Sequence, residues 1–353
     1  MRSKTSSATR WIAAVLLTAG AGGPAAAAAA AEVVGGTVRE VEVAGNLART
    51  LQSVAANDKG PLWLAWEVPA VTSLRNACCF DRSFRRATCH LEGRDQSWGS
   101  SGEGPGSGHL RVLARWAGGR VERVRAVNDQ CPLDTGGLPF VHLSGVAPVD
   151  SVALLASLAE RDGGRHDEDQ PLAALAYHAD RAADAVLQRL AAAGRPADRR
   201  EQALFWIGQA RGAEGARFLA GVARNDPSPD IREKAVFSLS QSDAAEATPA
   251  IVEVARRDES PHVRGEALFW LAQTGGESVP QVLLERLDAD PSREVRKQAI
   301  FAITQLPDHL GTPLLMRIVR ERRDNEIRKE ALFWLGQSND PRALDFLEKV
   351  LEQ

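Results

Sequence analysis

The stretch "ALFWLGQ" at residues 331–337 places four large apolar side chains next to a glycine and a glutamine. Four similar heptapeptides come before it: "ALFWIGQ" at Ala203, "AVFSLSQ" at Ala235, "ALFWLAQ" at Ala267 and "AIFAITQ" at Ala299. Each begins 32 residues after the one before it. A fixed period of this size is typical of repeat proteins, in which every unit buries its apolar face against its neighbours.

Each unit contains two amphipathic segments. In one unit they are Thr248–Asp258 and Pro261–Gln273, and two helices of about 12 residues with two short turns fill such a unit. The apolar positions of 151–158 recur at 183–190, so the register extends back to about Val149. The sequence therefore predicts a mainly α-helical solenoid over 149–353, with six helix pairs and a final helix at Pro341–Gln353.

The units "DPSPDIREKAVFSLSQ" (226–241), "DESPHVRGEALFWLAQ" (258–273) and "DPSREVRKQAIFAITQ" (290–305) resemble HEAT repeats, in the short form associated with the bilin lyases of phycobilisomes. The resemblance covers about 149–353. It implies an α-solenoid in which an aspartate between the two helices and an arginine early in the second helix form a ladder between neighbouring units. The matching pairs are Asp226 with Arg232, Asp258 with Arg264, and Asp290 with Arg296.

We expect this ladder to be interrupted at both ends of the array. Arg322 replaces the aspartate ahead of Arg328, and Gly194 replaces it ahead of Arg200. A recurrent arginine can also mark an anion site. An arginine beside a recurrent aspartate is more often neutralised by it, so we assign these pairs a structural role.

Residues 1–31 have the organisation of a secretory signal. Arg2, Lys4 and Arg10 precede the apolar run 11–19, and an alanine-rich stretch with several A-x-A sequences ends before Glu32. A membrane anchor is the alternative, although the apolar run is well short of the roughly 20 residues that a bilayer span needs. We expect export to the periplasm or cell envelope, with no membrane span after signal removal.

The charge pattern argues against a nucleic-acid partner. Removal of residues 1–31 takes away three positive charges and no negative ones, so the formal charge changes from −3 to −6. Both signs are interspersed in the remaining chain, and they form no basic stripe that could follow a phosphate backbone.

Residues 32–148 differ from the repeats in their pattern. The segment "LWLAWEV" alternates so that its even-numbered residues, Leu62 to Val68, share one face of a strand. The segment 110–127 has the pattern of a hairpin around Gly118 and Gly119, and a helix is predicted near 45–57. We expect a small α+β domain, whose function the sequence does not define.

All four cysteines, Cys78, Cys79, Cys89 and Cys131, lie in this domain. An even number in an exported chain favours disulfides. The Cα atoms of the neighbours Cys78 and Cys79 are about 3.8 Å apart, below the usual disulfide range, so each is predicted to bond a different partner, in an order left open. A zinc site made of three cysteines and His90 is the alternative.

Sequence signals for catalysis are weak. The chain has no His-Glu dipeptide of the kind that HEAT-like iron hydroxylases carry, and "RHDED" at 165–169 is interpreted as a solvated turn. We therefore predict a non-enzymatic protein, with no cofactor or metal, that binds a protein or peptide partner. The alternative is an enzyme: a bilin-lyase-like isomerase or lyase, or a thiol oxidoreductase that uses Cys78 and Cys79.

Two residue types recur away from the core side of the second helix. At 100° per residue, the apolar residues of 231–239 that face the core span about 140°, whereas Phe237 and Gln241 lie roughly opposite. We predict a ridge on the concave side that binds the partner; the alternative is that the rings complete the core. The ridge residues are Phe205, Phe237, Phe269, Phe301 and Phe333 with Gln209, Gln241, Gln273, Gln305 and Gln337.

Large and small residues alternate at one further position. Trp206, Trp270 and Trp334 share it with Ser238 and Ala302. A large side chain that packs over a small one in the next unit explains this alternation. We predict that the three indoles lie in the core between units.

Overall fold

A computed structural model describes residues 32–58, 60–71, 77–80, 86–93, 97–100, 108–161 and 170–351 of the protein. The predicted signal segment, residues 1–31, and the "RHDED" segment at 165–169 lie outside these described residues.

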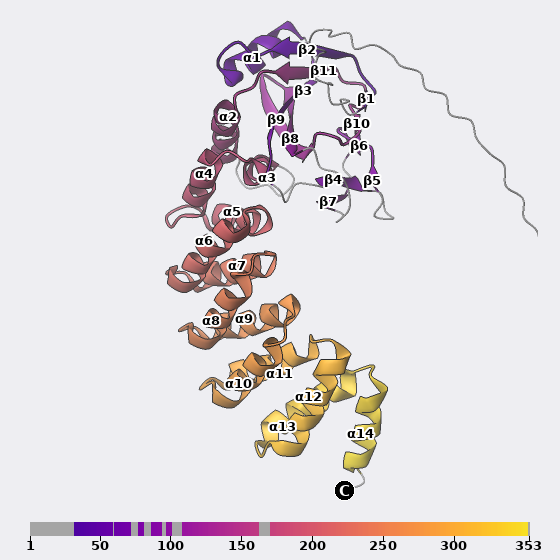
Figure 1. Ribbon diagram of the computed structural model, residues 1–353, viewed down its shortest axis with the longest axis vertical. Helices are drawn as coiled ribbons and strands as arrows, with labels where there is room; N and C mark the ends of the chain where they lie inside the picture. Colours follow the sequence, from indigo (N-terminus) through magenta and orange to yellow (C-terminus); the bar gives the residue numbers. More distant parts are fainter. Residues whose placement is uncertain are drawn as a thin grey trace, which may run out of the picture. The chain divides into compact units, whose positions relative to one another are not determined.

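The N-terminal region is built around a five-stranded mixed sheet (Figure 1). Its strands, in spatial order, are β2 (Val38–Glu42), β11 (Phe140–Ser144), β3 (Leu62–Pro69), β8 (His109–Ala117) and β9 (Arg120–Asn128). Strand β11 pairs in parallel with β2 and β3, whereas β3, β8 and β9 are antiparallel. The predicted strand and hairpin are confirmed, with Gly118 and Gly119 at positive φ in the turn.

The two faces of this sheet meet different groups of apolar residues. Leu64 and Trp66 belong to a core shared with α1 (Leu47–Asn57) and with the repeats, and the Trp66 indole donates a 2.9 Å hydrogen bond to Ser151. Trp63 and Ala65 pack with the cysteines on the other face. Because both faces are covered, β3 is buried along most of its length rather than on alternate residues.

Two small sheets and two disulfides complete this region. One sheet has the order β1 (Val33–Val34), β10 (Leu133–Asp134), β6 (Cys89–His90), and the other has the order β5 (Arg86–Ala87), β4 (Ala77–Phe80), β7 (Ser97–Ser100). Cys78 bonds Cys131 and Cys79 bonds Cys89, with Cα–Cα distances of 5.7 and 5.2 Å. The predicted division of the vicinal pair between two bridges is confirmed.

Thirteen helices follow within the described residues, as six pairs of an A helix and a B helix and one final helix. The pairs are α2 (Pro148–Arg161) with α3 (Gln170–Tyr177), α4 (Ala182–Ala191) with α5 (Ala197–Ala210), α6 (Gly212–Asn225) with α7 (Pro229–Ser240), α8 (Ala247–Arg257) with α9 (Pro261–Thr274), α10 (Val279–Ala289) with α11 (Arg293–Thr304), and α12 (Asp308–Glu321) with α13 (Asn325–Gln337); α14 (Pro341–Leu351) is last. The predicted α-solenoid is confirmed.

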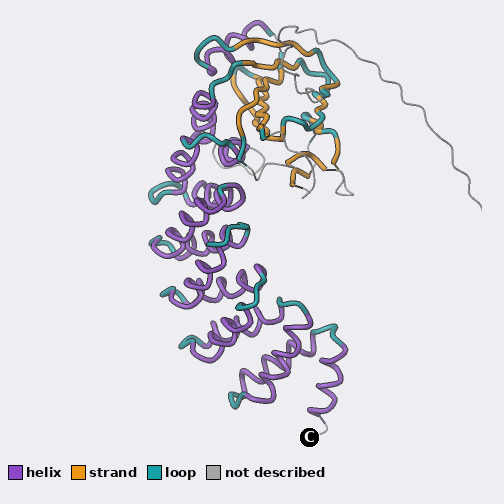
Figure 2. Tube along the Cα trace, viewed as in Figure 1, coloured by secondary structure: helices purple, strands orange, loops and turns teal. Residues whose placement is uncertain are grey.

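The helices of the array form two layers, as Figures 1 and 2 show for α4 to α9. Successive B helices pack on one another, and each A helix from α6 onward packs against the B helix before it. Local sequence explains where the B helices begin: the Ser260 and Ser292 side chains accept hydrogen bonds from the backbone N–H groups of Val263 and Val295. Among the described residues, no helix combines the length and apolar character that a bilayer span requires.

Candidate functional site

A continuous row of aromatic rings runs along the B helices. The row, called the aromatic row below, consists of Tyr177, Trp206, Phe205, Phe237, Trp270, Phe269, Phe301, Trp334 and Phe333, in order of contact. Successive ring centroids lie between 4.7 and 6.2 Å apart. These separations are those of favourable aromatic pairs.

The residue after each phenylalanine decides how the rings meet. Where the following unit has the small Ser238, Phe205 stacks directly on Phe237 with ring planes 13° apart. Where the following unit has Trp270, the indole lies 4.7 Å from Phe237 and 4.9 Å from Phe269. Both arrangements recur in the next two units. The alternation of large and small residues therefore organises the row.

Apart from Tyr177, which is buried, the rings of the row are only partly covered. Four of the phenylalanines are half-buried, and Phe333 is 56% exposed. The prediction that Trp206, Trp270 and Trp334 lie in the core was wrong, because these side chains are also half-buried. Their position lies about 100° round the helix from the phenylalanine, between the core arc and the outer face.

The predicted glutamines lie at or just beyond the C-terminal ends of the same helices. Gln241, Gln273 and Gln337 are exposed, and Gln209 and Gln305 are half-buried. The Gln273 amide donates a 3.4 Å hydrogen bond to the Gln305 side chain in the next unit. The glutamines thus form a polar edge beside the aromatic row.

Acidic side chains flank the row. Positions three, four and seven residues before each phenylalanine share its helix face. From α5 to α13 these positions hold eight carboxylates and three lysines, a formal excess of five negative charges with His262 neutral. The carboxylates are Asp198, Glu201, Asp230, Glu233, Glu266, Glu294, Glu326 and Glu330, and the lysines are Lys234, Lys297 and Lys329.

Glu266 is poorly compensated among these carboxylates. It is half-buried on α9 and forms no ion pair with any described residue, whereas Glu233 lies 3.2 Å from His262. Burial and the negative charge of Glu233 raise the pKa of Glu266, against smaller opposite effects of His262 and Lys234. This part of the face therefore holds negative charge that the protein does not balance.

A pocket of about 630 Å³ opens at the C-terminal ends of α5 and α7. Its lining includes Tyr177, Gln209, Gln241, three carboxylates (Asp184, Glu214, Asp243) and two arginines (Arg181, Arg211). Arg211 is already bonded, because it pairs with Asp184 and donates to the carbonyl oxygens of Ala176 and His178 at 3.0 and 2.7 Å. The pocket joins the glutamine edge to the first ring of the row.

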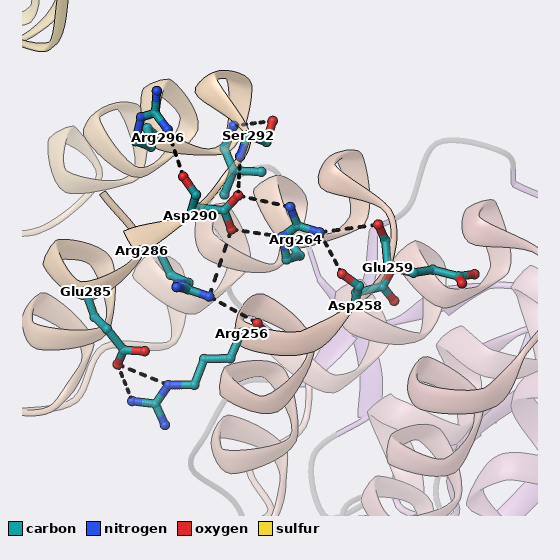
Figure 3. A network of polar contacts seen from close by, with 10 residues as sticks. Arg256, Asp258, Glu259, Arg264, Glu285, Arg286, Asp290, Ser292 and Arg296 are labelled. Carbon is teal, nitrogen blue, oxygen red and sulfur yellow. Dashed lines mark hydrogen bonds and ion pairs between the residues drawn. The ribbon is translucent and has the colours of Figure 1, made fainter. Parts of the chain in front are cut away.

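The aspartate–arginine ladder lies near the N-terminal ends of the B helices (Figure 3). Arg264 donates from Nε and Nη2 to the two carboxylate oxygens of Asp290, each at 2.9 Å, and from Nη1 to the carbonyl oxygen of Asp258 at 2.7 Å. Arg232 repeats this pattern with Asp258 and Asp226. Burial alone would raise the pKa of Asp290, but the hydrogen bonds from Arg264 and from the Ser292 backbone lower it.

The register of the ladder corrects the predicted pairs. The aspartate of the same unit offers only its carbonyl oxygen, and the ion pair joins each arginine to the aspartate of the next unit, 26 residues on. The ladder is not interrupted at Gly194, because Arg200 pairs forward with Asp226. At the other end Arg296 meets no aspartate at position 322 and bonds the Asp290 carbonyl at 2.8 Å.

A second polar cluster lies on the N-terminal sheet. Arg111 donates a 2.6 Å hydrogen bond to Glu67, which also contacts His142. Burial alone would raise the pKa of Glu67, but His142 and Arg111 together lower it, and Glu67 in turn raises the pKa of His142. Arg111 and His142 share the Glu67 carboxylate, and Glu40 lies 3.9 Å from His142. Because the charges of this cluster balance one another, we assign it a structural role.

The cysteines and His90 do not come together as a metal or thiol site. Cys78 and Cys79 are 2% and 3% exposed, and each is held in its disulfide. His90 lies 2.8 Å from Asp134. Within the described ranges, no group of three or more histidines, cysteines, aspartates and glutamates is arranged to hold a metal ion.

A family model of HEAT repeats matches residues 216–304 and 280–353. This part of the chain therefore consists of HEAT repeats, and the helix pairs α2–α3 and α4–α5 extend the array towards the N-terminus. No curated protein sequence matches the chain.

Several solved structures are similar to the repeats at low identity. A complex of CpcE and CpcF of phycocyanin lyase from Nostoc sp. is 15% identical with a TM-score of 0.34, over 44% of this chain and 98% of that chain. The Escherichia coli protein YIBA is 23% identical with a TM-score of 0.31, over 57% and 80%. Kap95p, from a complex with RanGDP, is 14% identical with a TM-score of 0.37, over 58% and 32%.

Proposed function

We propose that this protein is an exported, non-enzymatic scaffold of the cell envelope that binds a protein or peptide partner along the aromatic row. The row itself supports this proposal: nine rings from six B helices are in contact, and all of them except the buried Tyr177 remain partly open to solvent. Rigid aromatic side chains with adaptable amides beside them supply the contacts that dominate binding energy at protein interfaces. Solenoids present such side chains at regular intervals.

Export is supported by the pattern of residues 1–31 and by the two disulfides. Disulfides persist in oxidising compartments such as the periplasm. Cell fractionation followed by N-terminal sequencing tests this part of the proposal. We expect a mature chain that begins near Glu32 in the envelope fraction; a cytoplasmic chain that begins at Met1 would contradict it.

The double variant Phe269→Ala, Phe301→Ala tests the binding part. We expect it to keep its melting temperature within a few degrees, because both rings are half-buried, and to lose the partner that the full wild-type chain captures from envelope extract. Circular dichroism and quantitative mass spectrometry measure the two effects. Phe218→Ala is the matched control, since it removes a half-buried ring from A helix α6.

Two outcomes oppose the proposal. A loss of stability near the roughly 3–5 kcal/mol expected for each fully buried phenylalanine would show that the rings serve packing. Unchanged capture by the double variant would place the partner elsewhere on the protein.

A further inference from the structure

The positions three, four and seven residues before the phenylalanines, called the aromatic face below together with the row, carry a formal excess of negative charge. The formal charge of residues 32–353 is −6, and the face accounts for five of these negative charges. The A helices carry acidic groups too, but several of them are matched between units: Arg224 pairs with Glu253 and Arg256 with Glu285, each at 2.6 Å. Some carboxylates beside the row are matched in the same way, because Lys234 pairs with Glu201, Arg293 with Glu326 and Lys297 with Glu330 at 3.9, 2.7 and 3.9 Å. The carboxylates beside the row that form no ion pair with a described residue are Asp198, Asp230, Glu266 and Glu294.

Carboxylates and aromatic faces attract the same chemical group. The face of a phenylalanine or tryptophan ring is electron-rich and favours a nearby guanidinium or ammonium group. Glu233 and Glu266 lie on α7 and α9, the two helices that also supply Phe237, Phe269 and Trp270. A cation placed there would meet both kinds of attraction, whereas an acidic or purely apolar segment would leave the charge of Glu266 uncompensated.

The glutamine edge adds to this preference. The C-terminal ends of helices carry partial negative charge, and Gln209 and Gln241 lie at the ends of α5 and α7. The pocket between these ends has three carboxylates and two arginines in its lining; since Asp184 pairs with Arg211, the remaining Glu214, Asp243 and Arg181 leave one formal negative charge. A long cationic side chain fits a pocket of about 630 Å³ with such a lining.

We propose that the segment bound along the aromatic row is a cationic stretch of another protein, rich in arginine and lysine. This inference rests on the proposed function of the row and specifies the chemistry of its partner. Guanidinium and ammonium groups lie over the rings between the flanking carboxylates, and the aliphatic parts of the same side chains cover the apolar ring surface.

Peptide selection on the immobilised full chain tests the inference without a known partner. The probe is a random dodecapeptide display library, and the enriched peptides are synthesised and titrated by fluorescence anisotropy at low and high salt. We expect enriched peptides with net positive charge and binding that weakens as salt is added, since exposed charges are screened.

Two pairs of substitutions with the same charge change separate the face from general electrostatics. Glu233→Gln with Glu266→Gln is expected to weaken binding of an enriched peptide by about fivefold to tenfold, as loss of two partly exposed ion pairs would. Glu253→Gln with Glu285→Gln, on the A helices, is expected to change it less than about twofold.

Other outcomes overturn the inference in distinguishable ways. Neutral or acidic enriched peptides that still require Phe269 and Phe301 would contradict the charge preference and leave the proposed binding face intact. If both pairs of Glu→Gln substitutions weakened the binding of a basic peptide equally, the attraction would be non-specific. No enrichment, or enrichment that is independent of both phenylalanines, would oppose the inference and the binding face together.

Discussion

The ladder and the aromatic row recur every 32 residues on the same B helices, yet they differ in burial and in the number of bonding partners within the protein. Arg232 is 3% exposed, and its hydrogen bonds go to Asp226 and Asp258, whereas Phe333 is 56% exposed. The ladder is closed because its charges are buried and paired. The row keeps aromatic surface available. Recurrence alone therefore does not identify a binding site; burial and the presence of partners separate the two.

The largest expected effect tests the ladder, whose charges are buried and paired. Arg232→Ala leaves Asp258 buried without its guanidinium, and loss of one member of a buried pair costs roughly 3–5 kcal/mol of unfolding free energy. Arg296→Ala is the matched control, because Arg296 lacks a carboxylate in the next unit and gives up one bond to a carbonyl oxygen, worth about 1 kcal/mol. Urea denaturation measures both. Equal losses would mean that the ion pairs do not hold the units together.

A pH titration tests whether burial, rather than closeness to the row, decides the outcome. His178 follows Tyr177, the first ring, but is fully buried, and its Nδ1 accepts a 3.1 Å hydrogen bond from the Asp180 backbone. Burial lowers the pKa of His178 from 6.5 to about 4, with a smaller contribution from Arg211 and an opposing one from Asp180. The folded protein thus holds this ring neutral, while the unfolded chain binds a proton below about pH 6.5.

The sign of the effect follows from that difference. Folding stability is expected to fall as the pH drops from about 6.5 to about 4, by roughly 3 kcal/mol in total for this group. His178→Asn keeps an acceptor near the position of Nδ1 and removes the titrating imidazole. The difference in unfolding free energy between variant and wild type, called the gap below, should therefore change over this pH range. A gap that stays constant from pH 7 to pH 4 would show that the ring is protonated in the folded protein.

The sequence was most informative where one period repeats. The helix pairs, the ladder residues and the row of phenylalanines all follow from the 32-residue register, because each residue there meets the same neighbours in every unit. The N-terminal hairpin around Gly118 and Gly119 was equally local. The split of Cys78 and Cys79 between two bridges followed from covalent geometry, but their partners depend on how distant strands come together.

Contacts between units were harder to predict. The forward pairing of Arg200 with Asp226 depends on how one unit stacks on the next, so the break expected at Gly194 was wrong. The tryptophans were placed in the core because their alternation suggested packing, and the helix angle alone left them between core and surface. The acidic excess was visible in the sequence only after the face had been defined.

The smallest expected effects test the partly exposed rings of the aromatic row. Trp270 is half-buried between Phe237 and Phe269, so Trp270→Ala is expected to cost about 1–3 kcal/mol, less than the roughly 3–5 kcal/mol of a fully buried tryptophan. Phe333→Ala removes an exposed ring and is expected to stay within about 0.5 kcal/mol of wild type. Thermal melting of both variants measures this order. If Trp270→Ala reached the cost of a core residue and Phe333→Ala also destabilised the array, the row would be a packing seam like the ladder. If the two values stay small and unequal as expected, their difference follows the exposed fraction of each ring, and the surface left uncovered is what a partner can bury.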